Sequence, residues 1–309
     1  MGLPNVATVG PAPAEVSSPR RRRARGPLQW VRDGRVGTAI ALTPFFGFCV
    51  LFELIPVLIL LVGAIGGLAN PTPQYLLKVF QHPIYAQSVV NSLVLSTVSG
   101  VVGAVVGTAI GYAITASRHE RVRNGASALA NVTSASGGVG LAFAFIILLG
   151  ASGAITIALR SVGFDLYSGF SLYSLPGLII VYCYFQIPLM VVLMLPAFTA
   201  LKPEWREANM SLGGSGRDFW RRVAVPVLAP AIVSSFILMF ASGMGAYATA
   251  VALVAQANLM PVQISILRSG EVIFKPAQAD AMATVLLCFV AAAVTLYYLV
   301  KRWTQPWAR

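Results

Sequence analysis

The sequence has little charge. Only 10% of its 309 residues are Asp, Glu, Lys or Arg, whereas 57% are hydrophobic and the mean hydropathy is +0.77. Soluble domains carry about 25% charged residues, so the composition indicates an integral membrane protein. Acids are scarcest, with 10 Asp and Glu against 22 Lys and Arg. The basic residues gather at the ends of apolar runs rather than along one amphipathic face, which argues against a nucleic-acid partner.

Histidine and cysteine are also rare. His82 and His119 fall in different loops, so they suit neither a metal pair nor a catalytic triad. Cys49, Cys183 and Cys288 lie inside apolar runs, where thiols behave as small buried hydrophobic groups. A phosphate-binding G-x-x-x-x-G-K-[ST] loop is missing, so ATP hydrolysis by this chain is not expected. We therefore predict no catalytic residue, no bound metal and no cofactor on this chain.

Apolar runs long enough to cross a bilayer are abundant. A transmembrane helix needs about 20 apolar residues. Pro44 and Pro56 lie inside the first run and predict a kink or a break there. Six segments meet the length requirement, at approximately 36–68, 88–116, 126–149, 175–200, 225–255 and 281–300. The sequence therefore predicts an all-α membrane protein with six transmembrane helices.

The distribution of Lys and Arg predicts the orientation of these helices, because cytoplasmic loops are enriched in both. Eighteen basic residues fall in the two termini and in the loops after the second and fourth spans, and four fall elsewhere. Both termini are therefore predicted to be cytoplasmic. Residues 1–35 are rich in Pro, Ala and Arg and are predicted to form a disordered basic tail before a transmembrane domain over 36–309. A cleaved signal peptide fits less well, because the following apolar run is too long.

A polar segment at residues 201–226 separates the fourth and fifth predicted spans. Pro203 and the early acids Glu204 and Glu207 are typical of a helix start. Glycines at 213, 214 and 216 can end this helix and reverse the chain. A second helix is predicted from Phe219 onward, with arginines on its polar side. The segment is therefore predicted to be a helix–turn–helix hairpin on the cytoplasmic side.

The spacing in this hairpin resembles the coupling loop of ABC-importer permeases. That family has Glu-Ala-Ala, three residues, Gly, nine residues, and then aliphatic-x-aliphatic-Pro. The matching residues are Glu207, Ala208, Asn209, Gly213, Val223, Val225 and Pro226, with Asn209 in place of the second Ala. The chain is thus identified as resembling a type I ABC importer permease, although an ordinary charged cytoplasmic loop would show similar helix signals.

This resemblance implies partners and roles. It implies a second permease subunit, expected to be a paralogue, two ATPase subunits that hold ATP and Mg²⁺, an extracytoplasmic substrate-binding protein, and a multi-pass place in a bacterial cytoplasmic membrane. It also implies that the hairpin couples this chain to the ATPase subunits. The residues expected to do so are Glu204, Glu207, Ala208, Gly213, Arg217, Val223 and Pro226.

Three further stretches extend the resemblance. Asn91-Ser92-Leu93 opens the second predicted span as an Asn-Ser-Leu does in this family. The stretches 243–247 and 261–264 resemble permeases for polyamines, ferric iron, phosphonates, sulfate and molybdate. Glycines at 100, 103, 107 and 111 line the second span at small-xxx-small spacing. These glycines predict close helix packing, either inside the subunit or between subunits.

The substrate path is predicted to use polar and small residues within the spans. An acid inside an apolar run indicates function unless it pairs with a nearby Arg. Small and aromatic residues also serve ordinary helix packing, so both interpretations stay open. The candidates are Glu53, Tyr184, Gln186, Ser242, Met244, Tyr247 and Thr249. One intramembrane acid without a clear buried base favours a small organic solute such as a polyamine, with ferric iron, phosphonate, sulfate or molybdate, or a sugar as alternatives.

Two other classes of membrane protein fit the sequence less well. An ion-coupled secondary transporter would be expected to carry several intramembrane acids and an internal repeat, and the sequence shows one acid and no convincing repeat. A membrane-embedded lipid-modifying enzyme would gather polar catalytic groups at one interface, and few are present. Both classes predict no ATP-binding partner, so co-purification distinguishes them from an importer permease.

Overall fold

The computed structural model describes residues 36–68, 71–253, 258–270 and 274–304, with side chains described from residue 42 to residue 302. This part of the chain is helical and contains no β-strand. It divides into two units, one ending at Pro56 and the other beginning at Val57. The predicted tail at 1–35 lies outside the described residues.

The first predicted span is helical through both of its prolines. It comprises α1 (Val36–Cys49), a π-helical turn η2 (Val50–Leu54) and α2 (Ile55–Ala64). In η2 the N–H of Ile55 bonds to the carbonyl of Val50, five residues back. Pro56 has no N–H and its ring would crowd an α-helical turn, so a widened turn just before it keeps the helix continuous. The expected break is therefore a π-turn, and the helix ends at Ala64 rather than near Leu68.

The second unit holds the remaining helices. They are α3 (Gln74–Gln81), α4 (Pro83–Ala116), α5 (Glu120–Ser134), α6 (Val139–Leu149), α7 (Ala154–Ser161), η3 (Leu166–Ser168), α8 (Leu175–Thr199), α9 (Pro203–Ser211), α10 (Gly216–Phe219), η4 (Trp220–Ala224), α11 (Val225–Gly245), α12 (Ala248–Leu253), α13 (Met260–Ser269) and α14 (Pro276–Thr304). Across the described residues, six helical segments are long and apolar enough to cross a membrane. This confirms the predicted all-α fold with six candidate spans.

The third predicted span is wrong in its bounds. Residues 126–149 do not form one helix: α5 ends at Ser134 and α6 begins at Val139. Gly138, which precedes α6, has a φ of +100°, a conformation that glycine adopts far more readily than other residues. The segment that meets the requirements of length and hydropathy is Val139–Ser161. The polar helix α5 instead packs beside α8.

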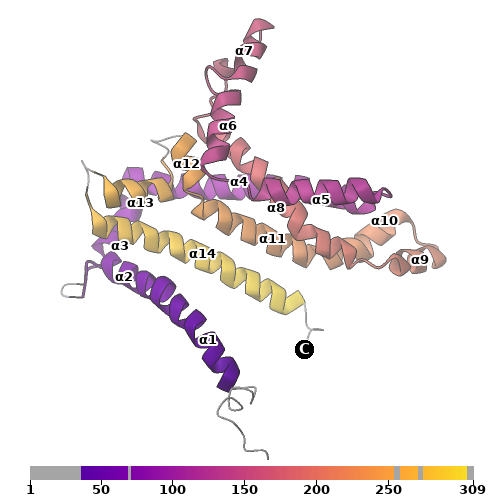
Figure 1. The fold of residues 1–309 in the computed structure, drawn as a ribbon, viewed down its shortest axis with the longest axis horizontal. Helices are drawn as coiled ribbons and strands as arrows, with labels where there is room; N and C mark the ends of the chain where they lie inside the picture. Colours follow the sequence, from indigo (N-terminus) through magenta and orange to yellow (C-terminus); the bar gives the residue numbers. More distant parts are fainter. Residues whose placement is uncertain (1–35, 69–70, 254–257, 271–273, 305–309) are drawn as a thin grey trace, which may run out of the picture. The chain divides into compact units, whose positions relative to one another are not determined.

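The core of the second unit is the packing of α4 against α8, with α11 beside both of them and α14 against α11 (Figure 1). Three glycines of α4 face this contact. A Cβ on Gly103 would lie 2.6 Å from Met239 Cε, and one on Gly107 would lie 2.5 Å from Met190 Cβ. A Cβ on Gly111 would lie 3.2 Å from the Phe198 ring. Within the described chain, the glycine stripe therefore packs α4 against its own neighbours.

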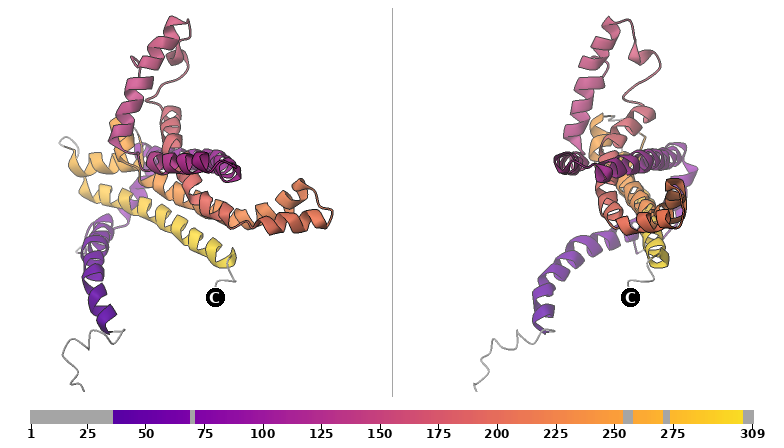
Figure 2. Two further views of the ribbon diagram at one scale, coloured as in Figure 1. Left: turned by 45° about the vertical axis from the view of Figure 1, so that its right-hand side comes forward. Right: turned by 90° about the vertical axis from the view of Figure 1, so that its right-hand side faces the viewer.

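The α9–α10 hairpin extends beyond the ends of α5 and α14 (Figure 2). The final turns of α4 and α8 lie at this same end, because Tyr112 is 4.8 Å from Trp220 and 6.0 Å from Phe198 between ring centroids. The first turn of α5 also lies there, because α5 begins at Glu120, shortly after α4 ends at Ala116. The short helices α3 and α13 lie against α14 near its start, at the opposite end. The second unit therefore brings the basic residues around Arg121, Arg206 and Arg302 to one end.

Candidate functional site

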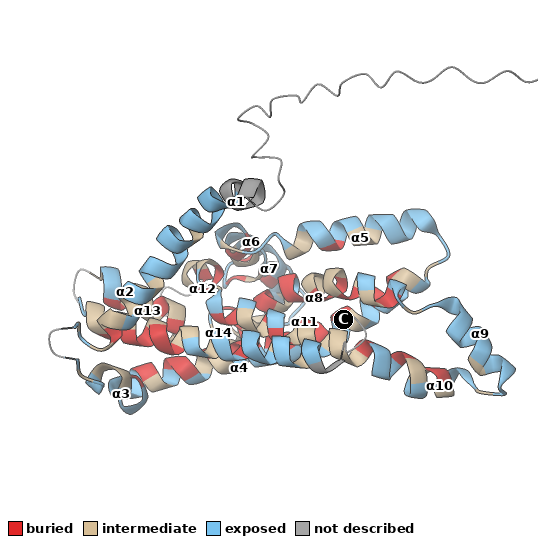
Figure 3. Ribbon diagram, turned by 90° about the horizontal axis from the view of Figure 1, so that it is seen from below, coloured by how far each residue is buried: buried red, intermediate tan, exposed pale blue. Residues whose placement is uncertain are grey.

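The first arm of the hairpin is the short helix α9. Pro203 occupies its first turn, where a missing N–H costs no hydrogen bond, and Glu204 follows where an acid favours the helix dipole. No residue of α9 is buried, and every residue except the half-buried Asn209 is exposed (Figure 3). Glu204, Glu207 and Ala208 thus lie on an exposed helix, which confirms the predicted helix over 203–212 to within one residue.

The turn of the hairpin is held by the one residue that departs from the family pattern. Asn209 Nδ2 donates to the carbonyl of Ser215 at 3.1 Å, across the turn. A Cβ on Gly214 would lie 2.5 Å from Asn209 Oδ1, so glycine there lets the amide approach. Gly213 has a φ of +76° and ends α9. Asn209 therefore ties the two arms of the hairpin together.

The second arm begins with a capping box. Ser215 Oγ accepts from the N–H of Asp218 at 3.2 Å, and Asp218 Oδ2 accepts from the N–H of Ser215 at 3.1 Å. Arg222 lies 3.8 Å from Asp218 as an exposed i,i+4 pair. Arg217 is exposed and forms no ion pair with a described acid. The arm is thus fixed locally at its start.

The second arm joins α11 without a break. The turn η4 is π-helical, with the N–H of Val225 bonded to the carbonyl of Trp220, and Pro226 follows directly. This is the same arrangement as at η2 and Pro56. Phe219 and Ala224 are buried and Val223 is half-buried, so one side of the arm is anchored in the helix bundle. The second arm and α11 therefore form one continuous helical segment, Gly216–Gly245.

A break separates α11 from α12 at residues 246–247. Breaking the helix frees backbone carbonyls that must find other donors inside a membrane protein. Tyr182, fully buried on α8, donates its hydroxyl to the carbonyl of Ala246 at 2.6 Å. The predicted fifth span over 225–255 is therefore interrupted between Gly245 and Ala248. The sequence does not predict this role for Tyr182, although a hydroxyl inside an apolar span is the signal that could have indicated it.

Two of the predicted path residues hold the segments around this break. Thr249 Oγ1 accepts from the N–H of Gly138 at 2.9 Å and lies 3.3 Å from its carbonyl oxygen, which joins α12 to the start of α6. The Tyr247 hydroxyl lies 3.0 Å from that of Ser265 on α13. Both side chains therefore position elements on either side of the broken helix.

The other predicted path residues differ in their surroundings. Gln186 is fully buried, and neither atom of its side-chain amide has a hydrogen-bond partner. A Cβ on Gly243 would lie 3.0 Å from Gln186 Nε2 and 3.1 Å from Ser96 Oγ, so these polar groups meet where α4, α8 and α11 cross. Ser96 Oγ is likewise buried and unpartnered. This crossing holds unused hydrogen-bonding capacity in the middle of the apolar helices.

The remaining candidates for the substrate path add no polar side chain to the crossing of α4, α8 and α11. Met244 is buried in an apolar cluster with Met260 and Met282, whereas Ser242 is exposed. The exposed Tyr184 packs edge-on against Phe145 with ring centroids 5.5 Å apart. Glu53 lies in η2 of the first unit, three residues before Pro56. Among the described residues, no group of three His, Cys, Asp or Glu side chains could hold a metal ion.

The Asn91-Ser92 pair connects distant segments of the chain. Asn91 Nδ2 donates to the carbonyl of Asn258 at 3.0 Å, and Ser92 Oγ accepts from the N–H of Met260 at 2.9 Å. The second bond satisfies a free donor at the start of α13. The motif therefore anchors the segment between the broken helix and α13 onto α4.

Comparison with known proteins shows which family has this fold. Residues 103–309, more than half of the chain, match a family model described as "Binding-protein-dependent transport system inner membrane component". No curated protein matches the chain.

Several solved structures share the fold. A chain of a bacterial ABC transporter involved in the import of the acidic polysaccharide alginate superposes with a TM-score of 0.68 and 15% identity, over 91% of this chain and 97% of that one. A chain of the MetNI methionine ABC transporter gives 0.54 and 18%, over 71% and 95%. A chain of an amino acid ABC transporter with histidines gives 0.50 and 17%, over 74% and 97%.

Proposed function

The chain belongs to the family of binding-protein-dependent transport system inner membrane components, as a type I ABC importer permease, and from this we propose that the α9–α10 hairpin couples it to ATP hydrolysis on other subunits. The observation that carries the proposal is the hairpin itself. It is exposed, internally tied by Asn209 and the Ser215 capping box, and continuous with α11.

The proposed coupling is mechanical. Movement of two ATPase subunits would displace α9, and α9, which Asn209 ties to the second arm, would move with that arm as one body. Because η4 runs into α11, the displacement would reach the break at Ala246, where the Tyr182 hydroxyl holds the loosened backbone. The crossing of α4, α8 and α11 could then open and close around the solute, in alternating access.

The proposed assembly follows from the two ends of the second unit. The end with the hairpin and most of the described basic residues would face the cytoplasm and dock two ATPase subunits, which hold ATP and Mg²⁺. The end with α3 and α13 would face a substrate-binding protein. A second permease subunit, proposed to be a paralogue, would complete the path in a bacterial cytoplasmic membrane. One solved structure similar to this chain is a bacterial alginate ABC transporter in complex with an alginate pentasaccharide-bound periplasmic protein, which supports such an assembly.

Charge reversal in the hairpin tests the proposed coupling. Glu207→Lys should abolish uptake while ATP hydrolysis continues, because the exposed carboxylate would be lost from the docking surface. Gly213→Asp should act in the same direction, because glycine accepts the φ of +76° most readily. Uptake and ATPase rates would be measured on reconstituted transporter.

The matched control for this test is Glu120→Lys, the same charge change on the exposed first turn of α5, outside the hairpin. It should keep transport and ATP hydrolysis linked. Normal uptake by Glu207→Lys at normal expression would remove the hairpin from the mechanism.

We also propose that the solute is a small organic molecule such as a polyamine. Within the described spans, Glu53 is the acid that lies away from the helix ends, and no Lys or Arg accompanies it there. A cationic solute would use such an acid, whereas an oxyanion would require basic groups or N–H donors. Competition of spermidine against sulfate, phosphonate and a sugar for uptake tests this. Competition by sulfate but not spermidine would overturn it.

A further inference from the structure

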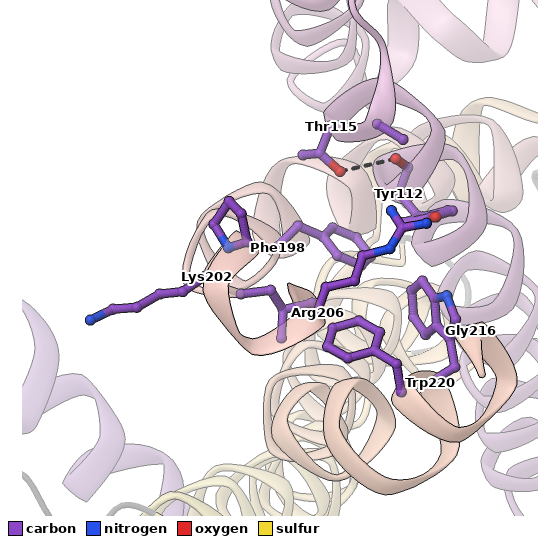
Figure 4. A pocket seen from close by; sticks show the side chains of 11 residues that line it. Tyr112, Thr115, Phe198, Lys202, Arg206, Gly216 and Trp220 are labelled. Atoms are coloured by element: carbon purple, nitrogen blue, oxygen red, sulfur yellow. Dashed lines mark hydrogen bonds between the residues drawn. The ribbon is translucent and has the colours of Figure 1, made fainter. Parts of the chain in front are cut away.

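A cavity of about 290 Å³ lies at the root of the hairpin, where the last turns of α4 and α8 meet α9 and α10 (Figure 4). Much of its wall is aromatic or apolar. Tyr112 stands edge-on to Trp220 at 4.8 Å, and Phe198, Leu201 and Phe219 complete this side. The cavity is therefore a recess between α4, α8 and the hairpin, and Pro203 and Arg206 of α9 form part of its wall.

The charged groups that line the cavity are both cationic. Lys202 and Arg206 contribute to it, and no acid does. Neither cation forms an ion pair with any acid in the described part of the chain. Arg206 extends across the recess toward Tyr112, whereas Lys202 is directed away from it (Figure 4). The nearby carboxylate of Asp218 is already engaged by Ser215 and Arg222.

These groups are suited to one ligand chemistry. The guanidinium of Arg presents several N–H donors in a planar fork that matches phosphate oxygens. The Tyr112 hydroxyl and the indole N–H of Trp220 are further donors on the same cavity. We propose that this pocket binds a phosphate group, that of an anionic phospholipid from the leaflet where the hairpin emerges.

The surroundings favour a lipid as the source of that phosphate. Tyr112 and Phe198 lie in the final turns of two apolar helices, at the level where aromatic side chains meet the headgroups. Basic pockets beside transmembrane helices on the cytoplasmic side bind anionic headgroups. The cytoplasmic assignment rests on the proposed function. A bound lipid would fix α9 to α4 and α8, so the root of the hairpin would move with the bilayer surface.

Binding to the intact transporter in neutral detergent tests the proposal, because it requires neither uptake nor ATP hydrolysis. Short-chain phosphatidylglycerol, phosphatidylcholine, glycerol 3-phosphate and inorganic phosphate would each be titrated while the unfolding temperature is recorded. Phosphatidylglycerol should bind tightest. Arg206→Gln should weaken its binding about tenfold or more, because a charge-assisted hydrogen-bonded contact is lost. Arg206→Lys should fall between, because it keeps the charge without the fork.

The matched control is Arg121→Gln, which removes an exposed cation from the same end but outside the cavity. It should bind phosphatidylglycerol as the unmodified protein does. Equal binding by Arg206→Gln, or equal binding of phosphatidylcholine, would overturn the proposal. Inorganic phosphate or glycerol 3-phosphate binding as tightly as phosphatidylglycerol would assign the pocket to a soluble phosphate and overturn the lipid source. If Glu207→Lys transported solute normally, the coupling proposal would fail, but each of these binding results could still be interpreted.

Discussion

At the scale of single residues, glycine decides how closely the long helices approach. Gly103, Gly107 and Gly111 occupy one face of α4 where a single added carbon would meet α8, α11 or both. Their spacing predicted close packing but left the partner open. The contacts with Met190, Met239 and Phe198 assign these glycines to the interior of this subunit.

Gly107→Ala should lower the stability of the folded permease by about 1–3 kcal/mol, because its Cβ would meet Met190 Cβ and a backbone carbonyl that cannot move aside easily. Gly125→Ala is the matched control, since a Cβ on that glycine of α5 meets nothing within 4 Å. Alanine there should be neutral or slightly stabilising, because it favours a helix. Thermal unfolding of the purified variants measures both, and equal stability would contradict the packing argument.

At the scale of the element, the helices keep their backbone hydrogen bonds next to prolines and at a helix break in two different ways. Both η2 and η4 are π-helical turns that end two residues before a proline, at Pro56 and Pro226. The break between α11 and α12 is accommodated differently, by a hydroxyl donated from α8. Each device keeps the backbone hydrogen-bonded in an apolar setting.

Tyr182→Phe should destabilise the permease by about 1–3 kcal/mol, because the carbonyl of Ala246 loses its donor while the ring packing against Phe185 is retained. Tyr184→Phe, two residues away, removes a hydroxyl that has no hydrogen bond to any described residue, and it should change stability by less than about 0.5 kcal/mol. Unfolding temperatures in detergent would compare them. A larger effect for Tyr184→Phe would show that the break does not depend on this bond.

At the scale of the whole molecule, the second unit has two ends, and we propose a different partner for each. The hairpin lies at one end, and α3 and α13 lie at the other. The charge distribution predicts that the hairpin end is cytoplasmic. This sidedness is open to direct measurement.

Single cysteines in a background without Cys49, Cys183 and Cys288 would report it. Met210→Cys on α9 replaces a residue with 55% of its surface exposed, and Phe164→Cys, after α7, one with 59% exposed. A membrane-impermeant maleimide should label Phe164→Cys in intact cells and Met210→Cys only after lysis. Labelling of Met210→Cys in intact cells would place the hairpin outside and contradict the proposed coupling.

The sequence by itself determined the class of fold, the number of apolar spans and the hairpin at 203–226. These follow from local chemistry: hydropathy over about 20 residues, proline early in a helix, and glycine at a reversal. It misplaced the third span, because hydropathy alone does not register a glycine such as Gly138 that takes a positive φ.

Only the tertiary structure decided which side chains meet. One contact crosses a turn, between Asn209 and Ser215. Others join segments that are far apart in the sequence: Tyr182 with Ala246, and Gln186 with Ser96 and Gly243. Arg206 likewise acquires its place in a cavity only when α4, α8 and α9 converge. Such contacts depend on how helices cross, and the apolar pattern of each helix fixes which residues avoid water but not which neighbour they touch.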